Sequence, residues 1–264
     1  MATFLGTNGA DVANAITGQL TGFTGGTLAE LQDAIGDVFY PFTGQDTIFA
    51  GSGSDLFHFP ILSSGVDIGT PNSLHGGGGN DTFRYEESAW SDSSATVVAA
   101  GEIIDGGTGL NTLEAFGLVD FRQAQILSIG VVRFHVPSVA FGGIPPPCSM
   151  NFLASQVSST GLASALSVIG NPGTDTYEEL QFTMGSVTYF DIRQFTFSTW
   201  GSENFIGITG DESSETIIGS SARDSINGGS GYDNLYGGAG DDIVDGAGNE
   251  DIVAGDAGND TLYG

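Results

Sequence analysis

The stretch GGSGYDNLYGGAGDDIVD, residues 228–245, consists of two consecutive blocks of nine residues that share one pattern. Each block opens with two glycines and carries an aspartate at its sixth place and an aliphatic residue at its eighth. The period covers the end of the chain in six blocks, which start at Gly210, Gly219, Gly228, Gly237, Gly246 and Gly255. A fixed period is typical of repeat architectures, in which each block packs on its neighbours. The stretch therefore predicts a solenoid.

The places that recur from block to block have distinct physical roles. An acid holds every sixth place, in the series Glu215, Asp224, Asp233, Asp242, Asp251 and Asp260. An aliphatic residue holds every eighth, in the series Ile217, Ile226, Leu235, Val244, Val253 and Leu262. The last three residues of a block fit a short strand with one inward side chain, which only stacking can bury. Glycines allow positive φ and a close backbone approach, and acids offer the hard oxygen ligands that Ca²⁺ prefers.

The blocks resemble the RTX family of calcium-binding nonapeptide repeats. This resemblance implies a right-handed parallel β-roll in which two blocks make one turn and each ion lies between loops eighteen residues apart. Four sites follow, joining Glu215 to Asp233, Asp224 to Asp242, Asp233 to Asp251, and Asp242 to Asp260. The implied ligands also include backbone carbonyls of the loops. The full candidate set is Glu215, Gly219, Ser221, Asp224, Gly228, Gly229, Ser230, Gly231, Asp233, Gly237, Gly238, Ala239, Gly240, Asp242, Ala247, Asn249, Asp251, Asp256, Gly258 and Asp260.

Several blocks depart from the pattern. Asn249 stands at a fourth place normally held by glycine, and asparagine is the next best residue for positive φ. Block 210 has Glu212 and Ser213 in its loop, and block 219 has Ala222 and Arg223. We therefore expect the sites of blocks 210 and 219 to be the weakest.

The composition is strongly acidic, with 32 acidic residues against five basic ones and a net charge of −27. Two carboxylates about 5 Å apart on adjacent turns repel by roughly 1–3 kcal/mol, so a column of them opposes folding until a cation binds. We expect the carboxyl-terminal roll to be disordered without calcium and to fold when it binds. Nucleic acid is excluded as a partner by the charge. The single Cys148 excludes an internal disulfide framework.

The sequence also bears on location. Residues 1–15, MATFLGTNGADVANA, lack the basic start and apolar core of a signal peptide, and no apolar run is long enough to span a membrane. We expect an extracellular or cell-surface protein. The RTX resemblance implies export by the type I secretion machinery, with a signal at the extreme carboxyl end. The chain stops at Gly264, the first residue of another block, and so is expected to be a fragment of a longer protein.

The same nine-residue phase recurs in the first half. Asp37, Asp46 and Asp55 lie nine apart, and Gly76–Arg84 reads GGGGNDTFR with Asp81 at its sixth place. Asn72, Glu102 and Asn111 are also in phase. The inward residue is often phenylalanine here, which predicts a wider and less metal-dependent core. Asp37 and Asp55 form a candidate site, and Asp81 is paired with Glu102; we expect one to three ions in 1–114 beside about four in 210–264.

The predicted fold is all-β, a right-handed parallel β-roll or β-helix with calcium-bound nonapeptide turns. Residues 1–114 form an amino-terminal solenoid of degenerate repeats with insertions. Residues 115–209 lose the glycine loops but keep strand-like runs rich in Val, Ile, Phe and Thr, and form irregular coils. Residues 210–264 form the calcium-binding roll.

Two functions of different class are compatible with the sequence. The favoured one is a non-enzymatic, calcium-dependent module of a secreted protein. The alternative is an enzyme that acts on extracellular polysaccharide, with its site on coils 85–209. The chain has no H-E-x-x-H motif and no G-x-S-x-G motif. The loop His75–Gly79 fits the repeat phase better than an oxyanion hole, and adjacent acids such as Glu178-Glu179 are expected on the solvated surface.

Two tryptophans raise the question of contact with a polysaccharide or cell surface. Trp90 and Trp200 lie in serine- and acid-rich contexts, SAWSDSS and STWGSEN. Either is a candidate platform for a sugar ring. The favoured interpretation is that Trp200 packs in the solenoid and that Trp90 lies in an insertion.

Overall fold

The computed structural model describes residues 1–264 except 43, 60–69, 87–95, 135–147 and 172–176. The described residues form short β-strands, one α-helical turn and one 3-10 turn. The strand pairs named below are parallel, apart from the antiparallel pair of β2 and β3. The prediction of an all-β fold built from parallel sheets is confirmed. Two compact units contain the described parts of 1–137 with 160–163, and of 138–159 with 164–264.

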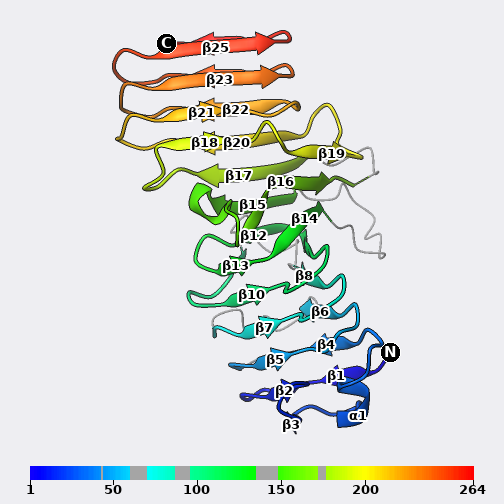
Figure 1. Cartoon of the computed structure of the whole chain (residues 1–264). Coiled ribbons are helices and arrows are strands. Elements are labelled where there is room, and N and C mark those ends of the chain that lie inside the picture. The colour runs from blue at the N-terminus through cyan, green and yellow to red at the C-terminus, as the bar shows by residue number, and fades with distance from the viewer. Residues whose placement is uncertain (43, 60–69, 87–95, 135–147, 172–176) are drawn as a thin grey trace, which may run out of the picture. The chain divides into compact units, whose positions relative to one another are not determined.

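The first unit stacks its strands in two main parallel rows (Figure 1, blue to green). One row runs β1-β4-β6-β8-β11-β14, the other β13-β10-β7-β5-β2-β3, and β9 pairs with β12. Its elements are β1 (Thr3–Leu5), β2 (Val12–Asn14), β3 (Gln19–Thr21), α1 (Leu28–Leu31), β4 (Val38–Tyr40), β5 (Thr47–Phe49), β6 (Leu56–Phe59), β7 (Ser73–His75), β8 (Thr82–Glu86), β9 (Thr96–Val97), β10 (Ile103–Asp105), β11 (Thr112–Phe116), β12 (Leu118–Asp120), β13 (Gln125–Leu127) and β14 (Ile129–Phe134).

The second unit is built in the same way. One row runs β15-β17-β20-β22-β24-β26, a second runs β18-β21-β23-β25, and β16 pairs with β19. The first two residues of β16, Leu162 and Ala163, belong to the first unit. Its elements are β15 (Cys148–Leu153), the 3-10 turn η1 (Ala154–Gln156), β16 (Leu162–Ile169), β17 (Glu178–Thr183), β18 (Tyr189–Asp191), β19 (Thr196–Ser198), β20 (Phe205–Thr209), β21 (Thr216–Ile218), β22 (Asp224–Asn227), β23 (Asn234–Ala239), β24 (Ile243–Asp245), β25 (Ile252–Ala257) and β26 (Thr261–Tyr263).

Four of the six eighth-place residues form the core of the last coils, whereas Val253 is half-buried and Leu262 is exposed. Ile226 lies opposite Val244 in the register of β22 and β24, and Ile217 lies opposite Leu235 in that of β21 and β23. All four side chains are buried. Each opposed pair is eighteen residues apart, so two blocks make one turn of the coil. This register also brings the sixth-place acids of successive turns next to one another.

Phenylalanine rings fill the core of the first unit. Phe4, Phe39, Phe57 and Phe83 come from successive coils and are fully buried, and their rings stack with centroids 5.1, 5.2 and 4.5 Å apart. The coils differ in length, because Phe39 and Phe57 are eighteen residues apart, whereas Phe57 and Phe83 are separated by a longer stretch that includes 60–69. The prediction of a wider, aromatic core in this half agrees with these contacts.

No helix of the described residues is long and apolar enough to cross a membrane. The division at 114/115 and 209/210 stays a prediction. The two compact units offer a different description of the chain, with the change of unit among 137–164.

Candidate metal centre

A ladder of hydrogen bonds joins the sixth-place acids of the last coils. In each case the backbone N–H of one acid donates to a carboxylate oxygen of the acid eighteen residues later. The bonds measure 2.8–3.1 Å in the pairs Glu215–Asp233, Asp224–Asp242, Asp233–Asp251 and Asp242–Asp260. All four acid pairs predicted from the sequence are therefore brought together. Since the coil is two blocks long, the pairs lie along two edges of the solenoid.

The other oxygen of these carboxylates is left without a protein partner in the described structure. Oδ2 of Asp233, Asp242 and Asp251 is buried and accepts no hydrogen bond. Each of these oxygens points beneath the first glycine of its own block, where a Cβ would lie only 2.5 Å away. A buried anionic oxygen without a donor is unfavourable unless a cation neutralises it. The glycine keeps open the space beside that oxygen.

The loops that enclose these oxygens have the backbone conformation expected from the sequence. In the loop of Asp242 positive φ occurs at the second and fourth places, at +105° for Gly238 and +140° for Gly240. Asn249 takes +82° at its fourth place, as its residue type predicts. Added Cβ atoms at Gly238 and Gly240 would collide with the carbonyl oxygens of Ser220 and Ala222 in the preceding loop. Backbone oxygens and carboxylates thus converge along the loops, and this all-oxygen donor set fits Ca²⁺.

The first two sites of the series differ from the others. Both carboxylate oxygens of Glu215 are buried without a partner. Asp224 Oδ2 instead accepts the backbone N–H and the hydroxyl of Ser220, at 2.7 and 3.0 Å. The sequence predicts a weak site in this block because of Ala222 and Arg223. Ser220, at the second place of the block, is the residue that competes for the carboxylate, and it was missed.

The first unit repeats the ladder with a different spacing. One column runs Asp37–Asp55–Asp81–Asn111, with N–H to side-chain oxygen distances of 2.7, 2.8 and 2.9 Å. A second runs Asp11–Asp46–Asn72–Glu102 at 2.8, 2.8 and 2.6 Å. The predicted pair of Asp37 and Asp55 is therefore adjacent. The predicted pairing of Asp81 with Glu102 was wrong, because alternate blocks occupy opposite edges of the coil.

A family model described as RTX calcium-binding nonapeptide repeat (4 copies) matches residues 42–58, 71–86, 209–244, 218–253 and 245–264. The chain carries RTX calcium-binding nonapeptide repeats. The matched RTX segments include every acid of the carboxyl-terminal ladder, and in the first unit they include Asp46, Asp55 and Asp81. Each of these three has one buried carboxylate oxygen without a partner. No curated protein matches the chain significantly.

RTX repeats bind calcium. In this chain the atoms available to a calcium ion are the oxygens of the loops and of the ladder acids. Among the described residues, no three His, Cys, Asp or Glu side chains cluster as a metal site. The oxygens that the RTX loops bring near one another are backbone carbonyls and single carboxylates of neighbouring turns. This is the composition expected of a calcium site in a glycine-rich turn.

Burial raises the pKa of several ladder acids. It raises the pKa of Asp242 to about 6 and that of Asp224 well above its ordinary value, in each case against the lowering effect of backbone hydrogen bonds. Repulsion from Asp260 and Asp242, respectively, adds to the rise. In the first unit burial raises the pKa of Asp46 and Asp81 to about 7. The RTX loops thus hold carboxylates that favour either a proton or a cation near neutral pH.

Glu102 gives a direct test of this electrostatic cost. It is fully buried, and burial raises its pKa to about 7 although it accepts hydrogen bonds from the Asn72 N–H and from the Tyr85 hydroxyl at 3.0 Å. A raised folded-state pKa gives stability that is present below about 4.5 and lost as the pH rises through about 7. We expect Glu102→Gln to stabilise the first unit by roughly 2–3 kcal/mol at pH 8 and to have little effect at pH 5.

Urea unfolding in EGTA at pH 5, 6, 7 and 8 measures this difference. Glu203→Gln is the control, because it removes the same charge from an exposed side chain. Parallel pH profiles for wild type and Glu102→Gln would contradict the assignment of the cost to Glu102.

Several ladder residues had no role in the sequence-based site. Asn72, Asn111 and Asn204 each accept a ladder hydrogen bond through the side-chain oxygen. The nine-residue phase located the first two without giving them a function. Glu178 was expected on the solvated surface, and this was wrong: it is buried, with Asn204 Nδ2 donating to its Oε2 at 2.6 Å. Residues 115–209 have lost the glycine pattern that would have indicated the ladder.

The loop His75–Gly79 belongs to the repeat, as expected. Gly77 and Gly79 have φ of +90° and +109°, the positive values of an RTX loop. His75 stacks on Phe49, with ring centroids 4.1 Å apart, and its Nδ1 lies 3.3 Å from Asp105 Oδ2. Its Nε2 lies 2.9 Å from Ser73 Oγ. This order of Ser, His and Asp matches a hydrolase triad, but the Ser73 N–H donates to the Asp46 carbonyl in the sheet instead of facing an oxyanion.

Proposed function

We propose that the chain is a calcium-dependent β-solenoid module of a secreted or cell-surface protein, whose carboxyl-terminal roll folds when it binds several Ca²⁺ ions. About four ions bind in 210–264, and one to three more bind in 1–114, at Asp37, Asp55 and Asp81. Each ion is held by ladder carboxylates of two successive coils and by carbonyls of the loops between them. The ion supplies positive charge at the point where carboxylates converge.

The observation that carries this proposal is the row of buried carboxylate oxygens without partners. Asp233, Asp242 and Asp251 present such oxygens on successive blocks, each beside a glycine that leaves space next to it. Without a cation the acids of adjacent coils repel one another at the expense of a marginally stable fold. With calcium the same acids attract a shared ion. Ion binding and folding are therefore coupled.

Calcium coupling also supports a location outside the cell. Extracellular calcium is high enough to saturate weak sites of the kind that extracellular modules use, in the 10⁻⁴–10⁻³ M range. A chain that stays unfolded until it meets calcium suits the type I secretion machinery, which the sequence resemblance implies. The module then acts as a scaffold or adhesive segment. We favour this non-enzymatic role because the Ser73 N–H of the hydrogen-bonded Ser73–His75–Asp105 row donates to the Asp46 carbonyl within the sheet and so does not serve an oxyanion.

Calcium titration by calorimetry, with circular dichroism recorded on the same samples, tests the proposal. We expect four or more ions per chain, and a gain of β-structure between EGTA and millimolar Ca²⁺. Magnesium is the matched control, because it has the same charge but demands small octahedral sites. Identical spectra in EGTA and calcium would refute the coupling of folding to calcium. Fewer than two ions per chain would refute the site assignment.

A further inference from the structure

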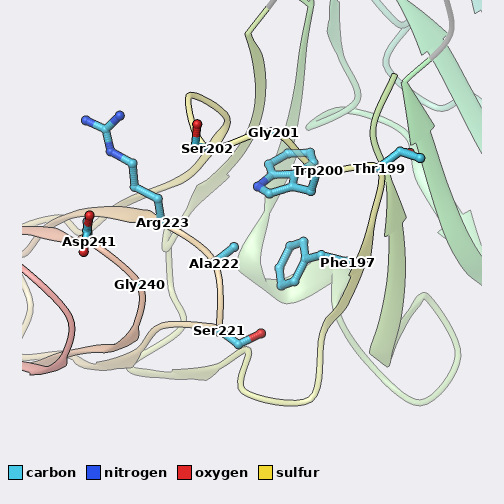
Figure 2. Close-up of a pocket in the computed structure, with 10 residues that line it drawn as sticks. All are labelled: Phe197, Thr199, Trp200, Gly201, Ser202, Ser221, Ala222, Arg223, Gly240 and Asp241. Atoms are coloured by element: carbon cyan, nitrogen blue, oxygen red, sulfur yellow. The ribbon is translucent and has the colours of Figure 1, made fainter. Parts of the chain in front are cut away.

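A cavity of about 670 Å³ opens on the second unit beside the RTX loops. One wall is the end of β19 and the turn after it, with Phe197, Trp200 and Ser202; the other is made by the loops that contain Arg223 and Asp241. In Figure 2 the two aromatic rings lie on one side of the opening and Arg223 and Asp241 on the other. The volume is in the range of sites for small ligands.

The aromatic wall suits the face of a sugar ring. The rings of Phe197 and Trp200 lie 5.7 Å apart at 46° to one another, and both side chains are half-buried. Each therefore keeps part of its surface accessible while its neighbours hold it in place. The negative faces of aromatic rings attract the weakly positive C–H groups on the apolar face of a pyranose. Trp200 was expected to pack in the solenoid, and its side chain is half-buried there; Trp90 lies outside the described residues.

The opposite wall suits the hydroxyl groups of the same ring. Arg84, Arg122, Arg133 and Arg193 each lie within 4 Å of a carboxylate, whereas Arg223 forms no ion pair within the part of the chain that the structure describes. Asp241 uses Oδ1 to accept the Asn259 N–H at 2.9 Å. A guanidinium donor and a carboxylate acceptor on one rim match the donors and acceptors of vicinal hydroxyls. Ser202 adds a hydroxyl at the edge.

The negative net charge of the chain favours a neutral sugar over an acidic one. The chain carries −27, so a polyanionic saccharide is repelled as it approaches. We propose that this cavity binds a neutral hexopyranose unit of a polysaccharide, stacked on Trp200 and Phe197 and hydrogen-bonded by Arg223 and Asp241.

The site is coupled to calcium, and this coupling rests on the function proposed above. Arg223 and Asp241 immediately precede Asp224 and Asp242, the acids of one candidate ion site. A Cβ at Gly240 would collide with the Ala222 carbonyl, so the two loops of the wall are in direct contact. An ion held between these loops fixes the wall that carries the polar groups. Sugar binding is therefore expected to require calcium.

The test is retention of the full chain on a panel of immobilised neutral glycans (cellulose, starch, mannan and galactan) in 2 mM Ca²⁺ and in EGTA, followed by calorimetry with the corresponding hexasaccharide. We expect at least one neutral glycan to bind in calcium. Trp200→Ala and Arg223→Ala each weaken binding tenfold or more, and Trp200→Phe keeps most of it. Tyr232→Ala is the control, because Tyr232 is an exposed aromatic residue that does not line the cavity. Circular dichroism and ion stoichiometry establish that each variant is folded.

The outcomes separate the two proposals. If the chain folds with calcium but retains no neutral glycan, or if Trp200→Ala binds as wild type does, the sugar site is refuted and the calcium module stands. If a glycan binds equally in EGTA and the spectra do not change, the sugar site stands and the calcium coupling is refuted. Equal or tighter binding of hexagalacturonate would overturn the neutral class of ligand.

Discussion

Asp242→Asn is expected to remove two calcium ions and to lower the stability of the carboxyl-terminal roll in calcium by about 5 kcal/mol. Asp242 takes part in two candidate sites, since Asp224 donates to its Oδ1 at 2.8 Å and its own N–H donates to Asp260 at 3.1 Å. Asparagine keeps the Oδ1 acceptor, so the ladder bond survives. It replaces the buried, unpartnered Oδ2 with an N–H₂ donor, which repels a cation. In about 10 mM Ca²⁺ a site with a dissociation constant of about 10⁻⁴ M is at 100 times that constant and contributes about 2.7 kcal/mol, and two such sites are lost.

The same substitution has the opposite effect without calcium. It removes a buried carboxylate, and burial raises the pKa of this carboxylate to about 6. It also removes the repulsion between this carboxylate and Asp260. The variant in EGTA should therefore be no less stable than the wild type. Glu250→Gln is the matched control, because it removes one negative charge from an exposed side chain in the next block. Calorimetry and urea unfolding with and without calcium measure both effects. Wild-type ion stoichiometry in Asp242→Asn would contradict the shared role of this residue.

The carboxyl-terminal coils could be predicted almost completely from the sequence. Their blocks have no insertions, so the nine-residue period fixes which side chains point inward and which acids meet eighteen residues apart. Ile226 and Val244 are opposed as the period requires, and Asp224 and Asp242 are joined beside them. A uniform period in the sequence becomes a uniform register in space, because each turn of the coil consumes the same number of residues.

Insertions limited the prediction for the first unit. Asp81 follows Asp55 by 26 residues and precedes its partner Asn111 by 30, so phase alone does not identify which acids meet. The partners could be chosen only by knowing that successive blocks alternate between two edges of the coil. The ladder also tolerates asparagine, since the bond needs an acceptor oxygen and not a charge. A search for acids at the sixth place therefore overlooks Asn72, Asn111 and Asn204 as structural members.

The nine-residue period also does not show whether a neighbouring side chain donates a hydrogen bond to a ladder carboxylate. Asp224 and Asp242 occupy equivalent places, but Ser220 donates to Asp224 Oδ2 and no described residue donates to that of Asp242. The difference arises from one hydroxyl residue at the second place of a block. The repeat pattern has glycine at that place, and serine there departs from it. Its effect on the carboxylate becomes visible only when the loop conformation is known.

The largest effect in the first unit is expected from Phe57→Ala, which should destabilise it by about 3–5 kcal/mol. Phe57 is fully buried between Phe39 and Phe83, with ring centroids 5.2 and 4.5 Å away. Alanine leaves a cavity in the middle of a stack, and the neighbouring rings cannot fill it without moving the strands to which they belong. Phe57→Leu keeps most of the buried area but loses the stacking, and should destabilise by about 1–1.5 kcal/mol.

Urea unfolding and hydrogen exchange of the peptides that contain β4, β6 and β8 measure this loss. Leu110→Ala is the control, because Leu110 is 60% exposed and its truncation should change stability by no more than about 0.5 kcal/mol. The aromatic stack does not depend on an ion, so the loss should be equal in calcium and in EGTA. A loss seen only in EGTA would mean that calcium, and not the phenylalanine stack, holds these coils together. In a solenoid each coil is stabilised mainly by its two neighbours, so a defect at Phe57 should open the coils on both sides of it together.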